Sequence, residues 1–110
     1  MADTIAAIAT APAVAAIAII RLSGDQSVAI ANHVFRSKQN LSDHPREMLY
    51  GNFINREKSL LDHGLAVYMK APNSYTGEDT VEFYCHGSLI VQRELLATIY
   101  SCLLYTSRCV

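Results

Sequence analysis

The sequence predicts a single α+β domain in which strands and helices follow the order β-β-α-β-β-β-α. Three observations favour this fold class. The 110 residues are 51% hydrophobic and 17% charged, which suits one core but not two. The segment "TVEFYC" at 80–85 alternates apolar and polar residues, as a strand with one buried face does. Two segments, after Arg21 and after His86, carry apolar residues at helical spacing.

The apolar run at 5–20 leaves two interpretations open. It is shorter than the roughly 20 residues of a membrane span, Pro12 interrupts it, and no Lys or Arg precedes it. We therefore expect it in the core and not in a membrane. Alanine favours a helix while isoleucine favours a strand, so the run predicts either one broken helix or two strands around a turn.

The first helix is expected from about Asp25 to Phe35. Ser23 is the predicted N-cap, because Gln26 follows three residues later and completes a capping-box pattern. The polar stretch at 36–47 is predicted to be a loop.

A hairpin and a second helix complete the expected order. The segments "MLYGNFI" (48–54) and "GLAVYMK" (64–70) have strand character and are joined by a turn-like stretch. After the strand at 80–85, Ser88 is a suitable helix cap. The helix that follows should bury Val91, Leu95 and Ile99.

Charge and cysteine content exclude several classes of function. Nine basic residues stand against ten acidic ones, which gives a formal charge of −1 and no basic footprint for nucleic acid or an anionic membrane. Three cysteines without a secretory signal fit free thiols in a reducing cytoplasm. The histidines and cysteines show no metal-ligand spacing, so we expect no metal site.

No catalytic residue is assigned. Cys85 and His86 are adjacent on a strand and should point to opposite faces, with Cys85 a small buried hydrophobe. Gly77 is expected to supply a turn with positive φ, and Glu78 and Asp79 to shape the loop around it.

Three segments carry a resemblance to a known family. They are "DTIAAIAT" (3–10), "IIRLSG" (19–24) and "APNSYTGEDTVEFYCHG" (71–87). Together they resemble the N-terminal domain of the tRNA-modification GTPases MnmE, also called TrmE. The similarity extends to about Ser101, so residues 1–101 are expected to be this domain and 102–110 a tail outside the family pattern. No GxxxxGK[ST] phosphate loop is present, and this chain is not expected to hydrolyse GTP.

The resemblance implies a β2-α-β3-α unit with a mixed sheet, a folate-binding half-domain related to aminomethyltransferases. It also implies a homodimer that binds 5-formyltetrahydrofolate and acts in the cytoplasm. For the longer parent protein, the resemblance implies modification of tRNA at wobble uridine 34 and association with the FAD-dependent partner MnmG. GTP, K+ and Mg2+ would belong to the GTPase module.

Within these motifs, Arg21 and Glu82 correspond to folate contacts in similar domains. A carboxylate can accept two N–H groups from a pterin edge, and a guanidinium can hold the carboxylates of a folate tail. The alternative is that Arg21 and Glu82 only pair with each other across the sheet. Glu82 should share its strand face with Tyr84.

Three departures from the family pattern keep other functions open. At 10–18, alanine takes the place of the glycines usual in the family. The chain has "CHGS" where the family has "CHGG", and it lacks the downstream lysine that contacts folate in the family. The alternatives are a ligand-free dimerisation module and an aminomethyltransferase-like enzyme that uses folate directly.

Overall fold

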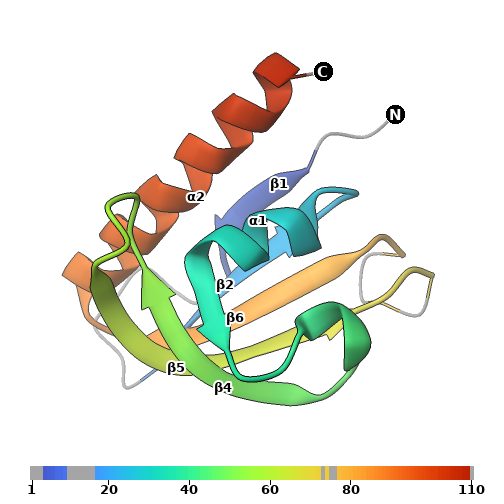
Figure 1. Ribbon diagram of the computed structural model, residues 1–110, viewed down its shortest axis with the longest axis horizontal. Helices are drawn as coiled ribbons and strands as arrows, with labels where there is room; N and C mark the ends of the chain where they lie inside the picture. Colours follow the sequence, from blue (N-terminus) through green and yellow to red (C-terminus); the bar gives the residue numbers. More distant parts are fainter. Residues whose placement is uncertain (1–3, 10–16, 73, 75–76, 110) are drawn as a thin grey trace.

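The computed structural model describes residues 4–9, 17–72, 74 and 77–109, and it describes side chains only up to residue 103. These residues form one six-stranded sheet and two α-helices (Figure 1). The elements, in chain order, are β1 (Ile5–Ile8), β2 (Ile17–Ser23), α1 (Ser27–Val34), β3 (Phe35–Ser37), the 3-10 turn η1 (Leu41–Asp43), β4 (Met48–Ile54), β5 (Leu60–Met69), β6 (Thr80–His86) and α2 (Leu89–Cys109).

The strand order is β1-β2-β6-β5-β4-β3, and every pair of neighbouring strands among the described residues is antiparallel. The α+β class is confirmed, but the predicted mixed sheet is wrong. The connection through α1 does join two strands of the same direction, β2 and β3. Because β6, β5 and β4 lie between them, these two strands never become neighbours, and no parallel pair forms.

The apolar N-terminal run forms two strands and not a broken helix. β1 pairs with β2 from Ile5 opposite Ser23 to Ile8 opposite Ile20. The connecting stretch, which includes the alanine-rich departure from the family pattern, lies largely in residues 10–16, outside the described residues. The predicted hairpin of β4 and β5 is also confirmed, although β5 begins earlier than expected, at Leu60.

The first helix is shorter than predicted and is capped differently. It runs from Ser27 to Val34, its N-cap is Gln26, and the predicted N-cap Ser23 belongs to β2. The Ser23 hydroxyl donates to Glu78 Oε2 at 3.1 Å. Thr4 Oγ1 instead accepts from the backbone N–H of Gln26 at 2.9 Å. A contact from Thr4, the residue before β1, therefore takes the place of the predicted local capping box.

The polar stretch at 36–47 is more ordered than the predicted loop. Its first two residues complete β3, which pairs with β4 at the sheet edge. Leu41 opens η1 and is only 2% exposed. A single buried leucine anchors this segment, and one residue creates no periodicity that sequence reasoning could detect.

The second helix confirms its prediction and extends past residue 101 to Cys109. Ser88 Oγ accepts from the N–H of Val91 at 3.5 Å, as expected of the cap. Leu95 and Ile99 are fully buried and Val91 packs against the core. In the described part of the chain, neither helix is long and apolar enough to cross a membrane.

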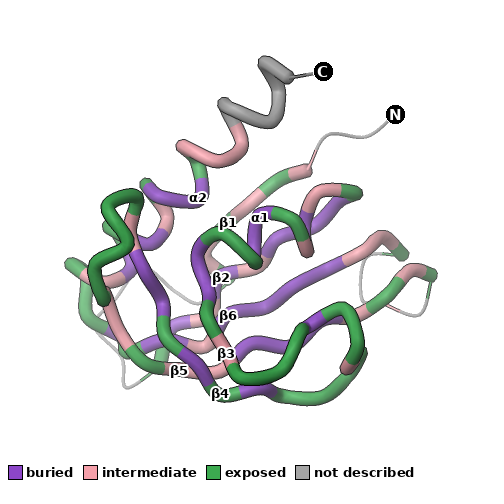
Figure 2. The backbone as a smooth tube through the Cα atoms, viewed as in Figure 1, coloured by how far each residue is buried: buried purple, intermediate pink, exposed green. Residues whose placement is uncertain are grey.

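The core lies between one face of the sheet and the two helices, and buried residues alternate with more exposed ones along β2 and β4 (Figure 2). Three phenylalanines form its centre. Phe53 and Phe83 contact edge to face with ring centroids 5.4 Å apart, and Phe35 lies 5.2 Å from Phe53. A Cβ atom at Gly64 would lie 2.6 Å from the Phe53 ring. Glycine at this strand position therefore makes room for the aromatic cluster.

We predict that Gly64→Ala lowers the free energy of unfolding by about 1–3 kcal/mol, because the added methyl group overpacks the Phe53 ring and the backbone of Tyr84. Urea denaturation followed by circular dichroism measures this change. Ser59→Ala, at an exposed neighbouring position, serves as the control and should change the midpoint little. Equal midpoints for Gly64→Ala and the wild type would contradict the packing argument.

Candidate functional site

The candidate site lies on the sheet face opposite the helices, here called the helix-free face. It is formed by the strand residues that alternate with the core residues. On β2 and β6 these are Ile17, Ile19, Arg21, Ser23, Thr80, Glu82, Tyr84 and His86. The face also holds large apolar side chains that are mostly exposed, among them Ile5 at 62% and Ile17 at 58%. Such exposure on a sheet indicates a contact surface.

Arg21 and Glu82 meet at the centre of this face. They are directly opposite each other in the antiparallel pairing of β2 and β6. Arg21 Nε donates to Glu82 Oε2 at 2.7 Å, and Arg21 Nη2 lies 2.5 Å from the same oxygen. The Glu82 side chain is only 12% exposed and that of Arg21 is 32% exposed. The two predicted site residues are thus brought together in the ion pair that the sequence offered as the alternative.

Tyr84 is the third member of the cluster. Its hydroxyl donates to Glu82 Oε1 at 2.7 Å, which confirms that the two residues share a face. Burial, followed by the hydrogen bond and the negative charge of Glu82, raises the pKa of Tyr84 to about 12, although Arg21 acts in the opposite direction. Tyr84 therefore stays protonated and acts as a donor at neutral pH.

The cluster leaves limited acceptor capacity for a ligand. A carboxylate has about four lone-pair sites. Two N–H groups of Arg21 occupy Oε2, whereas Oε1 accepts one described hydrogen bond. Ile19 and Leu65, the strand neighbours of Tyr84, and Val67, beside Glu82, supply apolar surface around the carboxylate. The Glu82 carboxylate can accept N–H groups from a ligand if the ligand shares Oε1 or displaces Arg21.

The loop before β6 is tied to the corner between β2 and α1. Asp79 Oδ1 accepts from the N–H of Ala71 at 2.9 Å, and the Asp79 carbonyl accepts from the N–H of Gly24 at 2.8 Å. Gly77 has φ of +81°, as the predicted turn requires. Glu78 accepts from Ser23. The two acids thus shape the loop, as predicted, and hold β6 in register with β2.

Cys85 and His86 point to opposite faces, as predicted. Cys85 is 3% exposed, and burial raises the pKa of its thiol to about 11, so it is a poor nucleophile. His86 is exposed, and its Nδ1 lies 2.7 Å from Asp62 Oδ1. Burial alone would raise the pKa of Asp62, but hydrogen bonds from His86 and the backbone lower it. Among the described residues, no three His, Cys, Asp or Glu side chains form a potential metal site.

The sequence missed two members of this region. Tyr84 was placed on the correct face, but its bond to Glu82 depends on a rotamer that alternation does not specify. Asp62 fell in a predicted turn, so its contact with His86 across the paired strands had no local signal. Strand register alone reveals neither contact, since Tyr84 and Glu82 lie on one strand and Asp62 is paired with Phe53 of β4.

We predict that Glu82→Gln lowers the pKa of Tyr84, because the charge and the charged acceptor are lost while burial remains. NMR titration with labelled tyrosine ring carbons measures this value among the six tyrosines. In the wild type, the pKa of Tyr84 in the folded state lies above its unfolded value of about 10. The contribution of Tyr84 to stability is therefore fully present below pH 10 and is lost as the pH rises toward 12. Glu94→Gln, at an exposed helix position, is the control. An unchanged Tyr84 titration in Glu82→Gln would contradict the assigned contact.

Comparison with known proteins identifies the family. Residues 4–108 match the family model described as the N-terminus of the GTP-binding protein TrmE. The chain is 44% identical over 102 residues to a tRNA modification GTPase MnmE from Clostridioides difficile, covering 90% of the chain. It is 46% identical over 101 residues to one from Alkaliphilus metalliredigens, covering 88% of the chain, and 45% identical over 106 residues to one from Synechococcus, covering 94%. It spans about 22% of the length of each relative. The chain therefore belongs to the family of TrmE N-terminal domains.

Proposed function

We propose that this chain is the N-terminal module of a tRNA-modification GTPase, and that it binds 5-formyltetrahydrofolate on the helix-free face and forms a homodimer. The observation that carries the proposal is the Glu82 carboxylate. It lies nearly buried on the helix-free face, between a guanidinium and a tyrosine hydroxyl. A structural ion pair alone does not require the second donor, whereas a ligand site benefits from a carboxylate held in one orientation.

The roles of the three side chains follow from their geometry. Tyr84 fixes one oxygen of Glu82, and that oxygen retains a lone pair for an N–H group of the pterin edge. Arg21 is the more exposed partner, so it can turn toward a carboxylate of the folate tail. Bound folate would supply the one-carbon unit, and the residues of this chain would bind and orient it.

The dimer is supported by the edge of the sheet. β1 is the edge strand of the sheet. Ile5 of β1 and Ile17 of the neighbouring β2 are exposed on the helix-free face. An apolar edge strand promotes association, and a second copy related by a two-fold axis would cover it.

The remaining functions belong to the longer protein of which this domain is a part. We propose that GTP, K+ and Mg2+ bind outside these residues. Modification at wobble uridine 34 of tRNA, contact with MnmG and a cytoplasmic location would likewise be properties of the whole protein. The boundary between family domain and tail at residue 101 stays a prediction.

A ligand-free dimerisation module is the second candidate. One observation favours it: Arg21 and Tyr84 already contact both oxygens of Glu82, so the carboxylate is satisfied without a ligand. Binding measurements separate the two candidates.

We predict that the chain binds 5-formyltetrahydrofolate, and that Arg21→Ala and Glu82→Gln each weaken binding by about 1.5–3 kcal/mol, the range for hydrogen bonds to charged groups. Isothermal titration calorimetry measures the affinity, and circular dichroism checks folding. Arg93→Ala and Glu94→Gln make the same changes at exposed positions of α2 and should bind like the wild type. Equal affinity in all five proteins would refute the site, and no binding by the folded wild type would favour the ligand-free module.

We also predict that the chain sediments at twice its 12.1 kDa mass. Ile5→Asp combined with Ile17→Asp should produce monomers, because two charges would be buried in the proposed interface. Ile8 is unsuitable for this test because it packs against the core. Ile90→Asp, at a 74% exposed position on α2, is the control and should remain dimeric. A monomeric wild type at micromolar concentration in sedimentation equilibrium would overturn the dimer.

A further inference from the structure

A cavity bordered by three basic side chains lies at the other end of the sheet from Arg21. It has a volume of about 470 Å³ and is enclosed by α1, β3, α2 and the turn between β4 and β5. Its lining includes Asn32, Arg36, Asn55, Arg56, Lys58 and Thr98. The strand order places three strands, β6, β5 and β4, between β2 and this edge. The cavity is therefore separate from the Arg21–Glu82 cluster.

The cavity concentrates positive charge. Arg36, Arg56 and Lys58 line it, and none of its lining residues is acidic. Glu57 lies in the same turn but is not part of the lining. Within the described residues, the ion pairs observed involve none of these three cations. The whole chain has a formal charge of −1, so this concentration comes from the fold and not from the composition.

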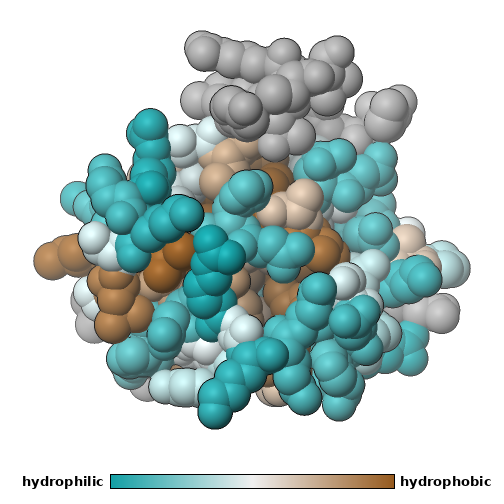
Figure 3. Space-filling view, viewed as in Figure 1, coloured by the Kyte–Doolittle hydropathy of each residue, from teal (hydrophilic) through white to brown (hydrophobic). Residues whose placement is uncertain are grey.

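The turn that presents two of the cations is fixed by its own hydrogen bonds. Asn55 Oδ1 accepts from the N–H of Glu57 at 3.0 Å and from that of Ser59 at 2.8 Å. Lys58 has φ of +64°, a conformation uncommon for residues other than glycine. Hydrophilic side chains crowd this corner in the space-filling view (Figure 3). The turn thus holds Arg56 and Lys58 without a counter-ion from the described chain.

We propose that this cavity binds phosphate groups. Two guanidinium groups can each donate two parallel hydrogen bonds to a phosphate, and the ammonium group adds a compact positive charge. The side-chain amides of Asn32 and Asn55 bring N–H donors to the same space, whereas the Thr98 hydroxyl already donates to the Glu94 carbonyl at 2.9 Å. The volume falls within the range of about 300–1,000 Å³ that is usual for ligand sites, and the three cations in the lining favour an anionic ligand.

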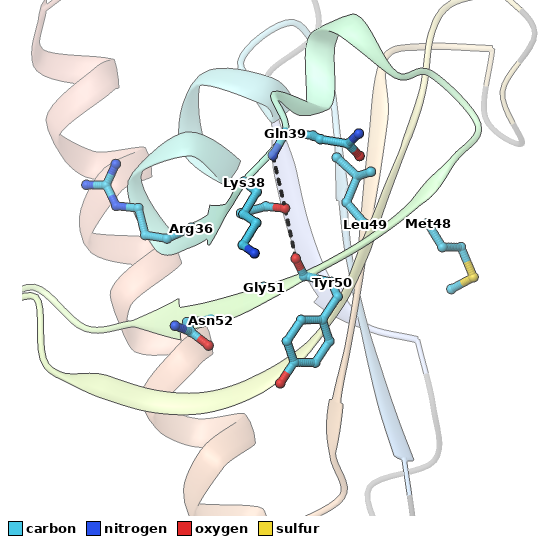
Figure 4. Close-up of a pocket in the computed structure, with 9 residues that line it drawn as sticks. Arg36, Lys38, Gln39, Met48, Leu49, Tyr50, Gly51 and Asn52 are labelled. Carbon is cyan, nitrogen blue, oxygen red and sulfur yellow. Dashed lines mark hydrogen bonds between the residues drawn. The ribbon is translucent and has the colours of Figure 1, made fainter.

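The surroundings indicate how large the phosphate-bearing ligand can be. Arg36 also lines two neighbouring cavities of about 300 and 610 Å³, both of which include Lys38. Figure 4 shows the larger one, with Lys38 and Tyr50 on the same side and Arg36 extending away from them. Tyr50 is 65% exposed and stacks on His63. Cations along a groove beside an exposed aromatic ring can hold the phosphates and one base of a single-stranded RNA.

Two probes test the site and identify the source of the phosphate. Pyrophosphate is titrated by calorimetry, and a fluorescently labelled six-nucleotide RNA by anisotropy, both at low ionic strength. We expect Arg36→Ala and Arg56→Ala each to weaken binding about tenfold or more. If the affinity for RNA also weakens in Tyr50→Ala and falls steeply with salt concentration, the site is assigned to nucleic acid. Binding of pyrophosphate that is unaffected by Tyr50→Ala assigns it to a small phosphate compound.

The control variant is Arg93→Ala, which removes the same charge from an exposed position outside the cavity. It should change either affinity less than twofold. Arg56→Lys keeps the charge but loses the planar fork, and should bind more weakly than the wild type. The proposal is overturned if neither probe binds, or if Arg93→Ala weakens binding as much as Arg56→Ala does.

Discussion

The antiparallel pairing of β2 with β6 is the constraint on which the rest of the structure depends. It places Ile20 opposite Phe83 on the core face and Arg21 opposite Glu82 on the helix-free face. Because strand faces alternate, a shift of β6 by one residue would turn Glu82 toward the core, away from Arg21, and would expose Phe83. The register is therefore determined by both faces together. The hydrogen bonds that connect the loop before β6 with the start of α1 secure the same alignment from one end.

Local sequence patterns predicted the individual elements well but not their arrangement. Alternation located β6, helical spacing located both helices, and turn-forming residues located the hairpin of β4 and β5. The errors all concern long-range partners. Ser23 was assigned to a helix cap because its bond to Glu78 is not visible in sequence, and the mixed sheet was inferred without knowledge of which strands separate β2 from β3. Burial of Leu41 likewise depends on distant residues.

The candidate site was predictable in its residues and not in its geometry. Motif resemblance selected Arg21 and Glu82, and alternation placed Tyr84 beside Glu82. Whether the arginine and the glutamate contact each other was undecided, since they are 61 residues apart. Net charge was a poor guide to the other end of the sheet, because it averages over all surfaces. A nearly neutral chain can still gather three cations around one cavity.

The strand order also has a consequence for the time course of folding. β1 and β2 are synthesised before the other described strands, yet the strand that pairs with the inner edge of β2 is β6, the last of the six in chain order. Contacts between residues so distant in sequence slow folding, because a long loop must close before they form. The isoleucines of the first hairpin therefore lack their β6 neighbours until most of the domain has left the ribosome. During this interval a nascent chain is exposed to association with chaperones or with other nascent chains.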